Sequence, residues 1–157
     1  MQVNLYLVQH AEAKREEEDP QRSLSKKGWT DIRKVAAYIA EHINIQASSI
    51  VHSGKTRARQ TAETLAEYLD PSEGIEEVKG LEPLAEPSAW VNRLAETKED
   101  IMLVGHLPHL GKLSAHLLCQ DETKKILDFQ MGGIVCLRKD ESGIWSVQWM
   151  ILPQLIP

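Results

Sequence analysis

The sequence predicts an α/β fold: a single three-layer domain in which a mainly parallel central sheet is flanked by helices. Three observations predict it. Short apolar runs alternate along most of the chain with longer segments whose apolar residues recur at helical spacing. The last quarter holds two short apolar runs around a turn, which predicts a C-terminal antiparallel hairpin. There is no internal repeat or linker, so residues 1–157 are expected to form one domain.

The predicted elements of the first half follow from local signals. The apolar, partly β-branched run Val3–Val8 predicts a buried strand. A charged loop follows, and Ser25 is a good N-cap for an amphipathic helix that reaches about Asn44. Ser49–His52 predicts a brief second strand. A Ser-Gly turn leads into a second helix, which ends before Pro71 because the residue preceding a proline disfavours helical backbone.

The second half continues the alternation and then changes character. A proline in the first turn suits the start of a helix, so Pro108 predicts a helix there. The remaining predicted elements are an edge strand at Ile75–Val78, a loop at Gly80–Pro87, a helix at Ser88–Thr97, a strand at Asp100–Val104, and hairpin strands at Ile134–Arg138 and Trp145–Leu152.

Composition narrows the class of partner. Apolar residues make up 42% and charged residues 26% of the chain, as in ordinary globular proteins. The formal charge is −5, which argues against a protein that binds nucleic acid through a broad basic surface. No apolar run approaches the ~20 residues of a membrane span, and no targeting segment is evident. We therefore expect a cytoplasmic protein with no nucleic-acid or membrane partner. Cys119 and Cys136 are expected to be buried free thiols.

Three residues suited to phosphate chemistry follow three predicted strands. His10 follows the first predicted strand. Arg57 lies in the first turn of the helix that follows the second strand, and His106 follows the strand Asp100–Val104. Ligands of open parallel sheets bind beyond the carboxyl ends of the strands, so these residues are expected to meet in one crevice. A neutral imidazole is a competent nucleophile at pH 7, and a guanidinium can fork onto phosphoryl oxygens. The pattern predicts phosphoryl transfer through His10, with protonated His106 as an additional donor.

The sequence also resembles a known family at these residues. Leu7–Ala13 looks like the Arg-His-Gly signature of the histidine phosphatase (phosphoglycerate-mutase-like) superfamily. The segment Ser53–Glu63 is similar to its Ser-Pro-x-x-Arg-Ala-x-Gln-Thr-Ala motif, and Val104–Pro108 to its Gly-His-x-x motif. Arg22–Gly28 resembles the Leu-Thr/Ser-x-x-Gly segment that opens its first helix. The four matches occur in family order, and the short length most resembles the SixA-type phosphohistidine phosphatases.

The resemblance implies a phosphoglycerate-mutase-like fold and a hydrolase that needs neither metal nor cofactor. It implies His10 as the phospho-accepting nucleophile, with Arg57 and His106 in the phosphate pocket. Arg22 lies where SixA-like members carry a basic residue near that pocket. The implied partner is a phosphohistidine-carrying protein, such as a phosphotransfer domain, or a phosphate ester.

Two positions depart from the family signature. Gln9 replaces its arginine and Ala11 its glycine. The amide of Gln9 can still donate to phosphate, but a neutral hydrogen bond is about half as strong as a charge-assisted one. Reduced activity is therefore expected. The alternative function is a phosphate- or phosphoprotein-binding module with weak or no turnover.

The leaving group decides between two classes of substrate. A phosphomonoester leaves as an alkoxide that needs a general acid, and only Glu82 and Glu86 are placed as candidate acids. Phosphohistidine leaves as an imidazole, which needs less help. The sequence therefore favours phosphohistidine, with a small phosphomonoesterase as an alternative.

A metallohydrolase is a third hypothesis. Its ligands would be His10, His52, His106 and His109. This hypothesis is weaker, because no carboxylate recurs at ligand spacing among these histidines.

Overall fold

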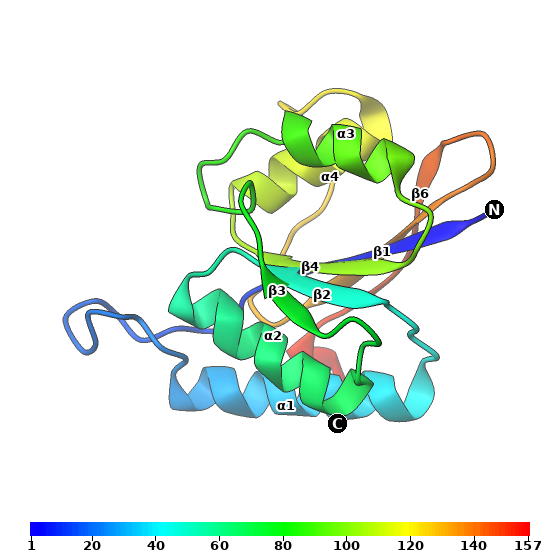
Figure 1. The fold of residues 1–157 in the computed structure, drawn as a ribbon. Coiled ribbons are helices and arrows are strands. Elements are labelled where there is room, and N and C mark those ends of the chain that lie inside the picture. The colour runs from blue at the N-terminus through cyan, green and yellow to red at the C-terminus, as the bar shows by residue number, and fades with distance from the viewer.

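The computed structural model describes all 157 residues and shows a six-stranded sheet between two pairs of helices (Figure 1). The strands are β1 (Val3–Gln9), β2 (Ser49–His52), β3 (Ile75–Glu77), β4 (Ile101–Gly105), β5 (Ile134–Lys139) and β6 (Trp145–Ile151). The helices are α1 (Lys26–His42), α2 (Thr56–Leu69), α3 (Ser88–Glu96), α4 (His109–Cys119) and the 3-10 helix η1 (Pro153–Leu155).

The strand order is β3-β2-β4-β1-β5-β6. The first four of these strands are parallel to one another, whereas β5 is antiparallel to β1 and β6 is antiparallel to β5. The predicted α/β class with a mainly parallel sheet and a C-terminal antiparallel hairpin is therefore confirmed. The parallel register brings the carboxyl ends of β1, β2 and β4 to one edge of the molecule.

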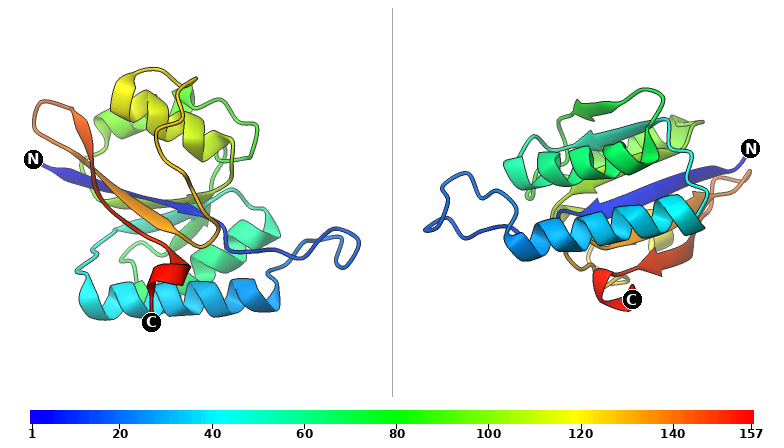
Figure 2. Two further views of the ribbon diagram at one scale, coloured as in Figure 1. Left: turned by 180° about the vertical axis from the view of Figure 1, so that it is seen from behind. Right: turned by 90° about the horizontal axis from the view of Figure 1, so that it is seen from below.

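Alternation along β1 divides the core between the two faces of the sheet. Leu5 and Leu7 belong to the apolar cluster under α3 and α4, whereas Tyr6 and Val8 belong to the cluster under α1 and α2. All four side chains are buried, as expected for a central strand covered on both sides. Figure 2 shows the two helical layers on opposite faces of the sheet.

The start of α1 is held against the chain that leaves β1. The hydroxyl of Ser25 caps the helix by accepting from the backbone N–H of Gly28 at 3.0 Å. A Cβ at position 28 would lie 2.0 Å from the carbonyl oxygen of Glu12, so only glycine allows this approach. The helix ends at His42, slightly before the predicted Asn44, because Ile43 is extended.

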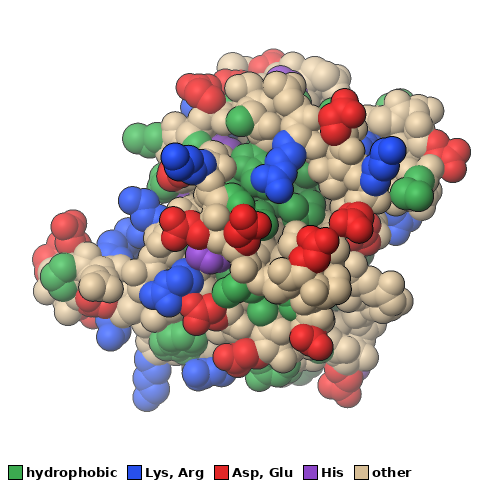
Figure 3. Space-filling view, in the orientation of Figure 1, with side chains coloured by type: hydrophobic (Ala, Val, Ile, Leu, Met, Phe, Trp, Pro, Cys, Tyr) green, Lys and Arg blue, Asp and Glu red, His purple; other side chains and the backbone are tan.

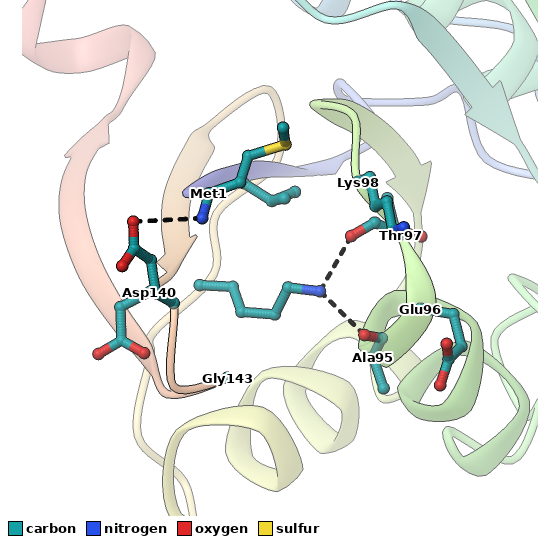
Figure 4. A pocket seen from close by; sticks show the side chains of 10 residues that line it. Met1, Ala95, Glu96, Thr97, Lys98, Asp140 and Gly143 are labelled. Atoms are coloured by element: carbon teal, nitrogen blue, oxygen red, sulfur yellow. Dashed lines mark hydrogen bonds and ion pairs between the residues drawn. The ribbon is translucent and has the colours of Figure 1, made fainter.

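A buried lysine connects β5 to α3. It lies at the end of the sheet opposite the carboxyl ends of β1, β2 and β4. Lys139 Nζ donates to the carbonyl oxygens of Leu94, Ala95 and Thr97 at 2.9, 3.0 and 2.9 Å. These carbonyls belong to the last turn of α3, where backbone acceptors lack helical partners. Lys139 lines a cavity of about 400 Å³ that also contacts Met1, Ala95 and Thr97, and these three residues are labelled in Figure 4.

The two cysteines are free thiols in different surroundings. Cys136 is buried as expected, but Cys119 is exposed, because it ends α4 at the surface.

None of the helices has the length and apolar character needed to cross a bilayer. Acidic and basic side chains alternate over the face shown in Figure 3.

Candidate active site

The two histidines that follow β1 and β4 lie together. The backbone N–H of His10 donates to the carbonyl oxygen of Gly105 at 3.1 Å, which joins the ends of the two strands. The ring centroids of His10 and His106 are 5.0 Å apart. Both side chains are almost enclosed, with exposed fractions of 8% and 2%. The parallel pairing of β1 with β4 thus produces the convergence that the sequence predicted.

One hydrogen bond determines the tautomer of His10. Its Nδ1 lies 2.7 Å from the carbonyl oxygen of Ala11. A carbonyl oxygen only accepts, so Nδ1 carries the proton and Nε2 keeps its lone pair. Ala11 is itself held in place, because its backbone N–H donates to Thr61 Oγ1 at 3.0 Å.

The surroundings keep the ring of His10 neutral. Burial, together with the positive charges of Arg57 and Arg22, lowers its pKa from 6.5 to about 4. The hydrogen bond to Ala11 opposes this shift only in part. At pH 7 the Nε2 atom is therefore an unprotonated nitrogen with a free lone pair.

Arg57 has no acidic partner. Its guanidinium forms no ion pair and no hydrogen bond with the protein, and its Nε is buried without an acceptor. Burial, and then the nearby charge of Arg22, lower its pKa. Arg57 lies in the first turn of α2, whose N-terminus has no side-chain cap. Free N–H groups and unpaired guanidinium nitrogens at one point suit an oxyanion.

A compact loop brings Arg22 to this cluster. The backbone N–H of Arg22 donates to the carbonyl oxygen of Asp19 at 2.8 Å, and its Nε donates to that of Lys14 at 3.1 Å. The carboxylate of Asp19 accepts from the backbone N–H of Gln21 and of Ser23. The loop is therefore braced from within, and the charge of Arg22 acts on the pKa of both Arg57 and His10.

His106 is neutral in the free protein. Burial, together with the neighbouring basic groups His10, Arg57, Lys55 and His109, lowers its pKa to about 3. The protonated His106 expected from the sequence is therefore absent without a bound anion. Its Nε2 lies 2.6 Å from Ser53 Oγ, and its Nδ1 is buried without a partner.

Gln9 lies at the end of β1 but faces different neighbours. It lines a cavity of about 340 Å³ that also contacts Glu12, Lys27 and Asp31. Its Oε1 is buried without a hydrogen-bond donor. The side chain makes no hydrogen bond to His10, and neither His10 nor His106 lines the cavity that Gln9 faces.

The two candidate acids differ in position. Glu82 is half-buried, accepts from the backbone N–H of Gly80 at 2.9 Å, and acts to raise the pKa of His109 against the larger lowering by burial. Glu86 is exposed. Of the two, Glu82 is the one that acts on the pKa of a buried histidine, His109.

No three His, Cys, Asp or Glu side chains are grouped so that they could hold a metal ion. The ring of His52 is occupied elsewhere, because its Nδ1 accepts from the backbone N–H of Gly54 at 3.1 Å. His109 is fully buried and neither of its ring nitrogens has a partner. The four histidines of the metal hypothesis therefore do not form a ligand set.

Two residues at the site were not identified from the sequence. Thr61 lies on α2, and its hydroxyl oxygen accepts from the backbone N–H of Ala11. Ser53 was noted only as a turn residue, yet it contacts His106. Both residues belong to the Ser53–Glu63 motif, and this motif match was the feature of the sequence that could have identified them as site residues.

Comparisons with known proteins agree with this architecture. The family model of the histidine phosphatase superfamily (branch 1) matches residues 5–89. An uncharacterised protein of Picosynechococcus sp. is 33% identical over 150 residues, covering 90% of this chain and 88% of that protein.

Solved structures share the fold. The protein histidine phosphatase SixA complexed with tungstate has a TM-score of 0.82 at 24% identity, covering 99% of both chains. The putative SixA of Agrobacterium tumefaciens has a TM-score of 0.77 at 22% identity, covering 96% of this chain and 97% of that one. Phosphoglycerate mutase of Bacillus anthracis has a TM-score of 0.70 at 13% identity, covering 94% and 92%. With the family model matched over more than half of its length, this chain belongs to the histidine phosphatase superfamily and has a SixA-like fold.

Proposed function

We propose that this protein is a phosphatase that removes the phosphoryl group from phosphohistidine on a protein, through a covalent intermediate at His10. The observation that carries the proposal is the state of His10. Its Nδ1 donates to Ala11, its ring is neutral, and its Nε2 keeps a lone pair beside an unpaired guanidinium. An imidazole held in this way is an activated nucleophile.

The reaction balances with the groups present. His10 Nε2 attacks phosphorus, the P–N bond of the substrate breaks, and the released imidazole takes up a proton. Water then attacks phosphorus on His10, which releases inorganic phosphate and restores the neutral ring. Arg57 and Arg22 hold the equatorial phosphoryl oxygens, where negative charge is carried in the transition state.

The weak acid assistance favours a phosphoramidate substrate. Glu82 accepts a hydrogen bond from the backbone N–H of Gly80, and Glu86 is exposed. An imidazole leaving group needs less protonation than an alkoxide. A substrate of this kind also agrees with the SixA proteins of the same fold, one of which is described as a protein histidine phosphatase.

The proposal is tested by comparing a phosphohistidine-carrying phosphotransfer domain with simple phosphomonoesters as substrates. We expect turnover of the phosphoprotein, loss of turnover in His10→Ala, and a phosphoryl group on His10 in mass spectra after an acid-free quench. His42→Ala is the matched control, because His42 is an exposed histidine at the end of α1. Unchanged turnover in His10→Ala would refute the covalent route, and faster turnover of monoesters would assign the protein to that class.

A binding module is the second candidate function, and Gln9 favours it. A neutral amide at that position leaves the phosphate with one cation fewer than the family signature provides. This function predicts binding of phosphate or vanadate that Arg57→Ala weakens, with no turnover of either class of substrate.

A further inference from the structure

Ser53 lies between the end of β2 and the histidine pair. It directly follows His52, and its side chain is nearly buried, with an exposed fraction of 9%. Its hydroxyl oxygen is 2.6 Å from His106 Nε2. The backbone N–H of Lys55 donates to the same oxygen at 3.3 Å. The Ser53 hydroxyl thus has one incoming donor and one ring nitrogen as neighbours.

The number of available protons determines whether Ser53 or His106 is the donor in the short hydrogen bond. The hydroxyl of Ser53 has a single proton, and His106 Nε2 is the only acceptor in contact with it. If Nε2 carried the ring proton, both the hydroxyl proton and the Nδ1 lone pair of His106 would be unpaired. If Ser53 donates to Nε2, only the N–H at Nδ1 is unpaired. Because each unpaired buried polar group costs about 1–3 kcal/mol, the second arrangement is favoured.

We propose that Ser53 is a positioning residue that fixes His106 as the neutral tautomer with its proton on Nδ1, so that His106 donates a hydrogen bond to the phosphoryl group. The inference rests on the proposed function for the identity of the anion. The tautomer itself is a property of the free protein.

This tautomer lets a neutral His106 donate a hydrogen bond to phosphate. Phosphoryl oxygens accept hydrogen bonds and do not donate them, so a histidine beside them must present an N–H. Protonation would supply one, but the buried ring of His106 is surrounded by positive or potentially positive groups. These groups are His10, Arg57, Lys55 and His109. A neutral donor set by Ser53 needs no proton from solvent and therefore works throughout the neutral pH range.

The direct test is nitrogen NMR of the free protein with labelled histidine. We expect His106 to show a protonated Nδ1 and an unprotonated, hydrogen-bonded Nε2 at pH 7. In Ser53→Ala the ring should shift toward the Nε2–H form, and Ser53→Thr, which keeps the hydroxyl, should retain the wild-type form. A protonated Nε2 in the wild-type protein would overturn the proposal.

Binding of inorganic phosphate gives a second readout. Loss of one hydrogen bond to a charged ligand predicts an affinity about 10-fold weaker in Ser53→Ala. Ser114→Ala is the matched control, because Ser114 is equally buried but bonds only to Gly111 within α4. Equal affinity of Ser53→Ala and wild type would contradict the proposal.

Rescue by the conservative variant separates this role from a merely structural one. Ser53→Thr keeps the hydroxyl that donates to His106 Nε2, so it should bind inorganic phosphate with nearly the wild-type affinity. A loss of affinity in Ser53→Thr as large as that in Ser53→Ala would overturn the proposal. Neither readout needs turnover, so a protein that binds phosphate without hydrolysing it would refute the proposed function and leave the role of Ser53 intact.

Discussion

The hydroxyl oxygen of Thr61 accepts a hydrogen bond from the backbone N–H of Ala11 at 3.0 Å and itself donates to the carbonyl oxygen of Arg57 at 2.7 Å. One fully buried threonine therefore connects α2 to the residue that holds His10. The position of the nucleophile relative to Arg57 depends on this link.

Thr61→Val should damage both stability and turnover. It leaves the N–H of Ala11 buried without an acceptor, which costs about 1–3 kcal/mol of unfolding free energy. It also loosens the carbonyl that orients His10, so kcat should fall. Urea unfolding and turnover measure the two effects. Thr64→Val is the control, because Thr64 is buried on the same helix but bonds only to the carbonyl of Gln60. Equal effects of the two variants would show that the link to Ala11 is unimportant.

Gln9→Arg should strengthen phosphate binding. It replaces a neutral donor by a cation, and a charge-assisted hydrogen bond exceeds a neutral one by about 1 kcal/mol or more, which corresponds to roughly 10-fold. Titration with inorganic phosphate and kcat/KM for the phosphoprotein measure the gain. Gln154→Arg is the control, since Gln154 lines the same cavity from η1. If neither quantity rises, Gln9 does not limit this site.

The buried histidines should make the fold sensitive to mild acid. The pKa of His10 is lowered to about 4 and that of His106 to about 3, so below pH 6.5 the unfolded chain binds protons that the folded chain refuses. Their contribution to stability is complete above pH 6.5 and declines as the pH falls toward those values. At pH 5.5 each histidine costs about 1.4 kcal/mol relative to neutral pH.

Thermal unfolding between pH 7.5 and 5.5 checks this expectation. Tm should drop by several degrees in the wild type, and by less in His106→Asn, which lacks one of the buried rings. His42→Asn serves as the control, because His42 is exposed. A Tm that stays level over this range in the wild type would contradict the assigned burial of the two rings.

Lys139→Met should destabilise the fold without altering the chemistry. Removing the ammonium leaves three carbonyls at the end of α3 without their donor, at a cost of about 2–4 kcal/mol. The histidine site lies at the other end of the strands, so the folded variant should keep the wild-type turnover. Lys98→Met is the control, because Lys98 lines the same cavity in an exposed position (Figure 4). A loss of turnover without a loss of stability would contradict this separation.

The sequence by itself determined the class of fold, the order of the elements and the segments that carry the site. A short continuous apolar run and a period-3.6 apolar pattern can both be recognised from neighbouring residues, so β1 and α1 could be predicted from the local sequence alone. The placement of His10, Arg57 and His106 at strand ends followed from that alternation and from the motif matches.

Only the tertiary structure decided the state of these groups. The protonation of His106, the tautomer of His10 and the contact of Ser53 depend on burial and on residues far apart in the chain, such as Ser53, His10 and His106. The same holds for Glu82 and Glu86, which look alike in the sequence but lie in different surroundings. Desolvation and hydrogen-bond geometry arise only when the strands pair, and for that reason no sequence pattern could supply them.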